Sequence, residues 1–421
     1  MLDVLVIGGG ITGVGIAQAA AAAGYSVALW ERDEIASGTS SHSSKLIHGG
    51  LRYLESGQLS LVRRCLQARR QLLQLAPSLV NPVPFYIPIY RDSQRGLMTL
   101  TAGLGLYALL AQGDALAKFT KVKLNETDDH QGLNQHNLRH MLQYWDAQTD
   151  DKALTLAVAA DAEKLGADIH QHRQVVDIYH GARVCQVCYS DPLGNEGSVR
   201  ASMVINAAGP WANDLLEHVT PKQLPPAVDW VQGSHLWLDI PAPSGVYYLQ
   251  SQLDERLFFV MPWQGKTLVG TTEVPLAVMP PQPQITLAEQ EYLLTNYHHY
   301  FSDHNRASLA GLILGHFCGV RALPKNEGSA FSRPRDTLLV QQANSPRLVS
   351  IYGGKLTEFM PIAADVLALI KAQLGKRSAI ADVNTRVIDS VAADFFTRRT
   401  SSAGVTVSND SADGIVQELA I

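Results

Sequence analysis

Several features that define other classes of protein are scarce in this chain of 421 residues. Its four cysteines have no regular spacing, which argues against a disulfide framework and for a reducing compartment. No apolar run reaches the length of about 18 residues that spans a bilayer, and no basic stretch precedes the apolar start, so we expect neither a transmembrane helix nor a targeting peptide. The net charge of −5 offers no general attraction to nucleic acid. We therefore expect a cytoplasmic protein with no nucleic-acid partner.

Several motifs of catalytic and metal-binding proteins are also missing. The chain has no P-loop, no GxSxG elbow and no HExxH motif. Cys185 and Cys188 form a CxxC, but the alternation of residues 182–189 is typical of a strand, and no second CxxC completes a zinc site. His170 and His172 share one face of a strand, with no third ligand evident. We expect no metal site.

The N-terminal residues have the pattern of a dinucleotide-binding unit. Residues 4–7 are typical of a short buried strand, and the glycine-rich turn GGGITG follows at 8–13. The alanine-rich stretch 11–23 predicts a helix whose first-turn amides and dipole would hold a pyrophosphate. A second buried strand, 26–30, ends at Glu31, which is placed to accept hydrogen bonds from a ribose hydroxyl. Strand, turn, helix, strand and acid in this order predict a bound dinucleotide.

The next segment does not continue into the further strand–helix units of an NAD dehydrogenase. Residues 36–44 form a small polar loop that could follow an extended cofactor. The run SSKLIHGGLRYLE at 43–55 then places small, basic and aromatic side chains where a flavin ring and its substrate would meet. These features favour FAD over NAD.

From this point the sequence resembles FAD-dependent glycerol-3-phosphate dehydrogenases of the respiratory type and the related glycerophosphate oxidases. The resemblance covers roughly residues 1–375. Its blocks are SSKLIHGGLRYLE at 43–55, YWDAQTDDKALTL at 144–156, NAAGPWA at 206–212, GSHLWL at 233–238, PWQGKTLVGTTE at 262–273, GVRAL at 319–323, SR at 332–333 and IYGGKLT at 351–357. It implies an α/β fold: a Rossmann-like FAD-binding domain with an antiparallel-sheet, α+β substrate domain, as in glutathione reductase and D-amino-acid oxidase.

Within this resemblance, the cofactor contacts are expected from the glycine-rich turn, Glu31, the polar loop, a strand whose backbone touches the adenine near Val175, and two later turns of small residues. A glycine pair that opens a helix beside the flavin would aim amides at the electron-poor end of the ring. The candidates are Gly8, Gly10, Ile11, Thr12, Gly13, Glu31, Arg32, Thr39, Ser40, Ser44, Lys45, Leu46, His48, Gly49, Val175, Ala207, Gly209, Trp211, Gly353, Gly354, Lys355, Leu356 and Thr357.

Oxidation of a phosphorylated secondary alcohol requires a base for the hydroxyl proton, a hydride acceptor (flavin N5) and cationic partners for the phosphate. The anion-binding candidates are Arg52, Arg321, Arg333 and Lys355, each inside a matched block. Tyr53 could donate a hydrogen bond to a substrate oxygen, and Thr271 and Thr272 could line the same pocket. We favour His235 as the substrate-side base and His48 as a flavin-loop residue. The alternative is surface salt bridges for the arginines and structural roles for the histidines.

A domain organisation follows from these assignments and from the length of the chain, which exceeds what one hydrophobic core usually serves. The helix expected at 57–76 carries Arg63, Arg64, Arg69 and Arg70, which suggest a solvated face. Respiratory members usually carry a further helical cap domain, and we expect none after residue 375. We expect a discontinuous FAD-binding domain at 1–90, 145–220 and 330–375, a helical excursion at 91–144, a substrate domain at 221–329 and a largely disordered tail at 376–421.

The almost uncharged segment 97–111 has basic residues on both sides. It is too short to span a bilayer, and two interpretations stay open: a buried helix under the substrate domain, or a helix lying in the membrane interface. The resemblance implies a monotopic enzyme that passes electrons to quinone, peripheral on the cytoplasmic face of the inner membrane.

Three functions follow, in order of preference. The first is FAD-dependent oxidation of sn-glycerol 3-phosphate to dihydroxyacetone phosphate by hydride transfer to flavin N5, with quinone or another acceptor reoxidising the flavin. The second is oxidation of a different phosphorylated or carboxylated alcohol, or of an amine. It is motivated by the absent cap and by Glu358 and Met360, where the family usually has Thr-Tyr-Arg after GGKLT. The third is a non-catalytic flavin-binding partner protein. Assembly into a homo-oligomer is left open.

Overall fold

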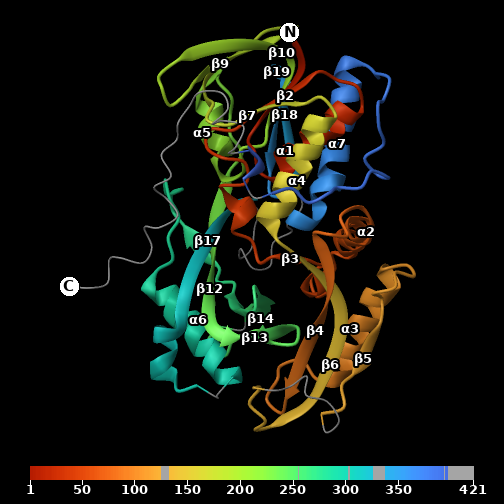
Figure 1. Ribbon diagram of the computed structural model, residues 1–421, viewed down its shortest axis with the longest axis vertical. Helices are drawn as coiled ribbons and strands as arrows, with labels where there is room; N and C mark the ends of the chain where they lie inside the picture. The colour runs from red at the N-terminus through yellow and green to blue at the C-terminus, as the bar shows by residue number, and fades with distance from the viewer. Residues whose placement is uncertain (125–131, 255, 302–303, 326–336, 393, 397–421) are drawn as a thin grey trace, which may run out of the picture.

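The computed structural model describes residues 1–124, 132–254, 256–301, 304–325, 337–392 and 394–396. Its strands form two sheets, each covered by helices, and Figure 1 shows them stacked along the long axis of the molecule. The N-terminal residues run into the upper sheet of that view, and the chain passes between the two sheets several times. Both sheets are therefore built from several separate stretches of sequence.

The first sheet contains the dinucleotide-binding unit. β1 (Leu2–Ile7) pairs in parallel with β2 (Val27–Trp30) and with β10 (Glu196–Asn206), and the strand order is β11-β8-β9-β10-β1-β2-β7. β19 pairs with β10, and β18 with β19. The remaining strands are β7 (Asp168–His170), β8 (Gln174–His180), β9 (Cys185–Ser190), β11 (Val219–Thr220), β18 (Leu338–Gln342) and β19 (Ser345–Tyr352).

Three helices cover one face of this sheet. α1 (Ile11–Ala22) lies between α4 (Asp151–Lys164) and α7 (Phe359–Leu374), as Figure 1 shows. α1 is alanine-rich and almost entirely buried, because its small side chains let helices pack against it on both sides. Its C-terminal end at Gly24, with φ of +87°, turns the chain into β2. A short helix, α5 (Ala212–Glu217), follows the 3₁₀ turn Gly209–Trp211.

The second sheet builds the substrate domain. Its order is β16-β12-β15-β14-β13-β4-β6-β3, with β17 beside β12 and β5 beside β6. The pairings are antiparallel except between β13 and β4. The strands are β3 (Leu46–Ile47), β4 (Val80–Tyr90), β5 (Phe119–Lys121), β6 (Leu138–Thr149), β12 (Val228–Pro241), β13 (Val246–Gln250), β14 (Leu257–Trp263), β15 (Lys266–Gly270), β16 (Val274–Leu276) and β17 (Ile313–Pro324).

Helices pack on both sides of the second sheet. α2 (Leu59–Leu75) and α3 (Leu97–Leu110) contribute to one apolar cluster, and α6 (Leu287–Tyr300) contributes to another with the 3₁₀ helix Arg306–Leu312. The region 221–329, expected to hold an antiparallel sheet, contains the strands β13, β14 and β15, which pair antiparallel in this order. The expected α/β fold with a mainly antiparallel second sheet is confirmed.

Some expected boundaries differ from the structure. β4 was expected in the FAD-binding domain, but it pairs with β6 in the second sheet. Among its described residues the segment 91–144 holds the helix α3, the strand β5 and most of β6, so it is only partly helical. The pairing of β4 with β6 joins stretches that are far apart in the sequence, and a local sequence pattern does not reveal it.

The end of the described chain also differs from the expected disordered tail. Residues 376–392 and 394–396 run along the first domain, where Ile388 and Phe396 are buried in its apolar cluster. The backbone amide of Ile380 donates to Ala22 O at 2.8 Å, and that of Ile388 donates to Leu75 O at 2.6 Å. The segment is irregular in backbone but packed, which composition alone does not reveal. Residue 393 and residues 397–421, the rest of the expected tail, lie outside the described residues.

Candidate active site

The glycine-rich turn fits closely around neighbouring backbone. Gly8 has φ of +111°, and a Cβ there would lie 2.5 Å from Ala207 O. A Cβ on Gly13 would lie 1.9 Å from Gly8 O, so only glycine allows α1 to approach the end of β1. α1 begins after Gly10, which provides no side-chain cap. The turn thus presents a helix N-terminus with backbone at its surface, as a pyrophosphate requires.

The expected ribose-binding acid lies beside the strand expected to touch the adenine. Glu31 follows β2, and its side chain accepts the amide hydrogens of Gly9 at 2.6 Å and Asp33 at 2.9 Å. Burial raises the pKa of Glu31 above its ordinary value. The amide of Arg173 donates to Glu31 O at 2.8 Å, and Val175 follows it on β8. The structure therefore brings residues 31 and 175, far apart in sequence, to one end of the sheet.

The polar loop closes over the turn from the other side. Ser40 Oγ accepts the Ile11 amide hydrogen at 2.9 Å, and Thr39 Oγ1 donates to Val320 O at 2.8 Å. The ammonium of Lys45 is buried and donates to Asp151 Oδ1 at 2.6 Å and to Ser41 O at 2.5 Å. This loop links the first sheet to β17 and α4, and Lys45 holds it in place with a charge pair.

His235 lies where β12 meets the flavin loop, by which we mean residues 44–50. Its Nε2 is 2.9 Å from Ser44 Oγ, and its ring stacks on Phe317 with a centroid separation of 4.8 Å. His235 is only 2% exposed. Burial, followed by the charges of Lys45 and Arg321, lowers the pKa of His235 to about 3. The imidazole is therefore neutral near pH 7 and is a weaker base than a free histidine.

Three of the four predicted cationic side chains gather around Tyr53 and Glu273. Arg52 and Arg321 lie 3.6 Å and 3.4 Å from the same Glu273 oxygen, Oε1. The Lys355 ammonium lies 3.8 Å from the centre of the Tyr53 ring, and the Arg52 guanidinium carbon 5.3 Å from it. The side chains of all three cations are largely covered. The interpretation of these groups as scattered surface salt bridges is not supported by this geometry.

The other candidates occupy the rim of this site or lie elsewhere. Thr271 Oγ1 donates to Thr272 O at 3.0 Å, next to β15. Arg333 lies outside the described residues. Gly353 and Gly354 both have positive φ, and Thr357 Oγ1 accepts the His48 amide hydrogen at 3.2 Å. Trp211, in the turn that includes Gly209, lies 4.4 Å from the Arg32 guanidinium carbon. Leu46 is on β3, and Thr12 is in the first turn of α1.

Glu358 stands at a position where the resembled family usually has a different residue. It is buried beside Lys355, which forms the cationic cluster together with Arg52 and Arg321. Its carboxylate lies 3.4 Å from Arg64 Nε and 3.9 Å from Lys355 Nζ. Lys355 Nζ also donates to Cys65 Sγ at 3.6 Å. Burial raises the pKa of the Cys65 thiol to about 12, so this cysteine is protonated at neutral pH. The Lys355 side chain is thereby held between the aromatic ring of Tyr53 and the carboxylate of Glu358.

Several acidic side chains that organise the site were not singled out from the sequence. Glu273 stands between the two arginines, and buried Asp151 pairs with Lys45. Buried Glu289 on α6 accepts hydrogen bonds from Ser234 Oγ at 2.6 Å and from Thr272 Oγ1 at 2.7 Å, and it also caps α6. Glu273 and Asp151 fall inside two of the matched blocks, and that position was the one available signal for them.

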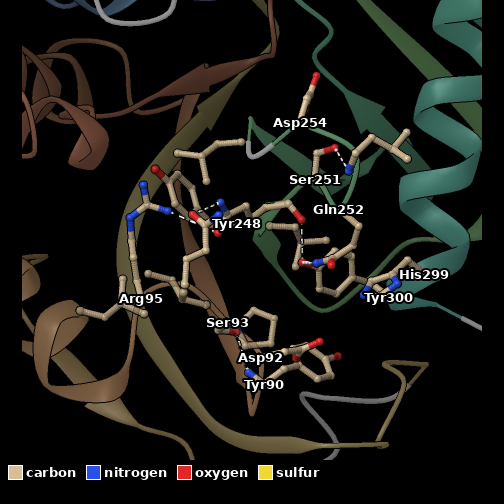
Figure 2. A pocket seen from close by; sticks show the side chains of 18 residues that line it. Tyr90, Asp92, Ser93, Arg95, Tyr248, Ser251, Gln252, Asp254, His299 and Tyr300 are labelled. Carbon is tan, nitrogen blue, oxygen red and sulfur yellow. Dashed lines mark hydrogen bonds between the residues drawn. The ribbon is translucent and has the colours of Figure 1, made fainter.

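A cavity of about 340 Å³ lies beside the cluster, between β4, β13 and α6. Figure 2 shows Arg95 on one side of it and His299 and Tyr300 on the other, with Tyr248 between them. Arg95 pairs with Glu55, next to the turn that carries Arg52. The cavity is therefore a neighbour of the candidate active site and shares the wall around Tyr248.

Possible metal ligands, cysteines and membrane-spanning helices are further features of the described residues. Among the described residues, no three His, Cys, Asp or Glu side chains come together as metal ligands would. Cys185 and Cys188 are on β9 and are free thiols, as the strand interpretation predicts. None of the helices in the described ranges is long and apolar enough to cross a membrane.

The sequence of this chain is similar to those of known proteins. A family model described as FAD dependent oxidoreductase matches residues 3–360. The glycerol-3-phosphate dehydrogenase of Pseudomonas aeruginosa is 34% identical over 374 residues, which are 88% of this chain and 71% of that protein. The D-erythritol 1-phosphate dehydrogenase of Brucella abortus is 34% identical over 370 residues, covering 86% of this chain and 72% of that protein.

Two solved structures share the fold. The glycerol-3-phosphate dehydrogenase of Bacillus halodurans, complexed with FAD, has a TM-score of 0.72 at 24% identity. The match covers 96% of this chain and 71% of that one. The L-alpha-glycerophosphate oxidase of Mycoplasma pneumoniae, with FAD bound, has a TM-score of 0.73 at 18% identity and covers 93% and 99%. The turn at Gly8, the acid Glu31 and the glycine pair after β19 also fit a dinucleotide stretched through the first domain. The chain belongs to the family of FAD-dependent oxidoreductases, and its cofactor is FAD.

Proposed function

We propose that this enzyme oxidises sn-glycerol 3-phosphate to dihydroxyacetone phosphate. The observation that carries the proposal is the convergence of Arg52, Arg321 and Lys355 beside Tyr53, at the edge of the flavin loop. The names of relatives such as that of Pseudomonas aeruginosa support the same substrate. The flavin, when bound, supplies the acceptor for the hydride that leaves the substrate carbon.

The cationic cluster suits a phosphate monoester. Arg52, Arg321 and Lys355 exceed the nearby carboxylates of Glu273 and Glu358 in charge, so an excess of positive charge is left for an anion. Guanidinium groups also match the oxygens of a phosphate geometrically and make charge-assisted hydrogen bonds. We infer that the phosphate binds between Arg52 and Arg321 and takes over part of the role that Glu273 plays for them.

The remaining requirement is a proton acceptor for the substrate hydroxyl. We infer that His235 takes this part, because its unprotonated imidazole lies next to Ser44 in the flavin loop. Its pKa is about 3 in the protein alone, and the negative charge of a bound phosphate would raise this pKa toward the working range. Tyr53 and Thr271 would orient the polyol oxygens, and burial of the ring against Phe317 fixes the direction of the imidazole.

Steady-state assays with an artificial electron acceptor test the substrate. We expect turnover of sn-glycerol 3-phosphate, and much slower turnover of glycerol at equal concentration, because glycerol has no group for the arginines. Turnover of glycerol at the same rate, or none of either compound by protein loaded with FAD, would reject the proposal.

A second candidate substrate is a longer phosphorylated polyol. The Brucella abortus relative is named for D-erythritol 1-phosphate and is as similar to this chain as the Pseudomonas relative. The cationic cluster would hold the phosphate of either compound. Comparing kcat/KM for the two phosphates discriminates them, since the better substrate by that ratio is the one the pocket fits.

We also propose that α3 lies on a membrane surface, where quinone reoxidises the flavin. α3 carries no charged side chain, and only Leu104 and Tyr107 on it are buried. Met98 is 87% exposed and Leu109 73% exposed. A helix that is apolar all round and so open is typical of a lipid-facing surface. Leu100 of the same helix lines the cavity at Tyr248, which gives a lipophilic acceptor a route toward the site.

Vesicle sedimentation tests the membrane contact. We expect the Met98→Glu, Leu109→Glu double variant to lose binding to anionic lipid vesicles. Leu193→Glu is the control, because Leu193 is 72% exposed but lies on the first domain, far from α3 in sequence and sheet. Equal sedimentation of the α3 variant and the parent, or none by the parent, contradicts the proposal. The proposal that quinone reoxidises the flavin is tested by the rate at which a short-chain quinone accepts electrons from the reduced protein. A rate no higher than that with oxygen would contradict it.

A further inference from the structure

α3 is fastened to the active site by polar groups, although most of its surface is apolar and exposed. In its last turn, the Tyr107 hydroxyl oxygen accepts the Gly49 amide hydrogen at 2.8 Å and donates to Asp146 Oδ2 at 2.7 Å. Gly49 belongs to the flavin loop. A single side chain on α3 is thus bonded to the backbone between His48 and the turn that carries Arg52 and Tyr53.

The flavin loop is built to accept this contact. A Cβ on Gly49 would lie 2.5 Å from the Tyr107 hydroxyl oxygen and 2.6 Å from Leu66, so only glycine leaves room for both. The next residue, Gly50, has φ of +78°, and a Cβ there would lie 2.3 Å from the Tyr53 ring. The two glycines therefore leave room for Tyr107 of α3 and for the Tyr53 ring on two sides of the same short stretch of backbone.

The Tyr107 hydroxyl is itself held by a buried ionic cluster. Asp146 and Arg69 are fully buried and paired with each other, and Arg69 Nη2 donates to Asp114 Oδ2 at 2.6 Å. Asp114 follows the C-terminal end of α3, while Arg69 comes from α2 and Asp146 from β6. Burial, followed by the Asp146 charge, raises the pKa of Tyr107 well above its ordinary value, so the hydroxyl keeps its proton.

A second tie joins the N-terminal side of α3 to the substrate-side turn. Arg95, just before the helix, pairs with Glu55 through both Nε and Nη2, the latter at 2.8 Å. Glu55 follows the 3₁₀ turn Leu51–Leu54, which carries Arg52 and Tyr53. A displacement of α3 would therefore move both the flavin loop and the 3₁₀ turn that carries Arg52 and Tyr53.

We propose that Tyr107 is a positioning residue of the active site, which ties α3 to the flavin loop through the Gly49 amide. A contact on the outer surface of α3 would then change the geometry of the flavin loop. The function proposed above assigns that contact to a membrane surface. This inference rests on that function for its biological meaning, but the contact itself does not depend on the identity of the substrate. Reactivity depends steeply on alignment, and a misplacement of about 1 Å can cost on the order of a hundredfold in rate.

The experiment compares Tyr107→Phe with Tyr144→Phe in FAD-loaded protein. Tyr144 is the matched control: it is buried in the same cluster, with its ring 5.9 Å from that of Tyr107, and it lies on β6 rather than on α3. Three quantities are measured: hydrogen–deuterium exchange of the peptide containing Gly49, the visible flavin spectrum with its reduction potential, and kcat and KM with the best substrate.

For Tyr107→Phe we expect exchange at Gly49 about tenfold faster or more, a shifted flavin spectrum and potential, and kcat lowered about tenfold or more with a smaller change in KM. Tyr144→Phe should match the parent in all three within about twofold. If both variants match the parent in exchange and spectrum, or if both change equally, the positioning role is wrong and Tyr107 is only part of the core.

Two further results separate this inference from the function it rests on. If the parent fails to oxidise sn-glycerol 3-phosphate but Tyr107→Phe still alters exchange and spectrum, the substrate is wrong and the positioning role stands. If Tyr107→Phe cannot be isolated in folded form, Arg69→Lys loosens the support of Asp146 while leaving the Tyr107–Gly49 bond chemically intact. It should shift exchange at Gly49 in the same direction, and unchanged exchange in that variant would overturn the inference.

Discussion

The ammonium of Lys355 lies 3.8 Å from the centre of the Tyr53 ring. The two residues come from opposite ends of the chain, one from the turn after the flavin loop and the other from the glycine pair after β19. A cation held over an aromatic face is attracted to it, so Tyr53 fixes where the charge of Lys355 lies. The Arg52 guanidinium carbon lies 5.3 Å from the centre of the same ring, so Tyr53 brings the charges of Lys355 and Arg52 close together.

Removing that charge should weaken substrate binding. We predict that Lys355→Met lowers kcat/KM for sn-glycerol 3-phosphate by about 10- to 100-fold, because a charge-assisted hydrogen bond contributes about 1.5–3 kcal/mol. Lys371→Met, on the exposed side of α7, is the control and should not change the kinetics. A parent-like kcat/KM in Lys355→Met would mean that the ammonium faces neither substrate nor flavin.

Glu273 should compete with the substrate phosphate for the arginines. We predict that Glu273→Gln binds inorganic phosphate about fivefold more tightly than the parent, since removing a partly covered ion pair is worth roughly 1 kcal/mol. The measurement is inhibition of turnover by phosphate. The control is Glu291→Gln on α6, which breaks a different pair, that of Glu291 with Arg306. It should leave the inhibition constant for phosphate unchanged. Weaker phosphate binding in Glu273→Gln would show that Glu273 orients the arginines rather than competing.

His235 should make the stability of the protein depend on pH. Its pKa is about 3 in the folded state and about 6.5 in an unfolded chain, so below pH 6.5 the unfolded state binds the extra proton. The free energy of unfolding should therefore fall as pH decreases from about 6.5 toward 3, by up to about 1.4 kcal/mol per pH unit from this group.

The check is denaturant unfolding of His235→Asn at several pH values. The variant should have a flatter dependence than the parent in this range, and His136→Asn, at an exposed position, should not. The other histidines with lowered pKa values, His180 and His299, contribute equally to parent and variant. Parallel curves for parent and His235→Asn would show that the imidazole is already charged in the folded protein.

The irregular segment after residue 375 should contribute to stability. Ile388 is 1% exposed in the core of the first domain, so Ile388→Ala should lower the free energy of unfolding by about 2–4 kcal/mol. Ile380→Ala is the control, because that side chain is 63% exposed. Equal melting temperatures for the two variants would indicate that the segment leaves the core in solution.

The parts of the fold that the sequence predicts well are those with a local pattern. The strand–turn–helix unit at residues 4–31 and the alternating strands β13, β14 and β15 each have a periodicity that a short window contains. The site candidates came instead from the matched blocks, and some of these lie inside long strands, such as 233–238 in β12 and 319–323 in β17.

Long-range charge pairing was not predictable in this way. Arg69 was expected on a solvated face because it follows other arginines on α2, yet it is fully buried between Asp146 and Asp114. Nothing in the local sequence distinguishes it from exposed Arg63 or Arg70. The same holds for Glu273 and Glu289, whose partners lie tens of residues away. Buried charges are found only when the elements that bring their partners are known.

The most direct test of the whole account is anaerobic titration of the FAD-loaded protein with sn-glycerol 3-phosphate. The account predicts that the yellow flavin absorbance is bleached as the substrate is added, that glycerol at the same concentration does not bleach it, and that Arg52→Met, Arg321→Met protein needs far more substrate. Flavin that stays oxidised in the presence of the phosphate, in protein that has taken up FAD, would contradict it.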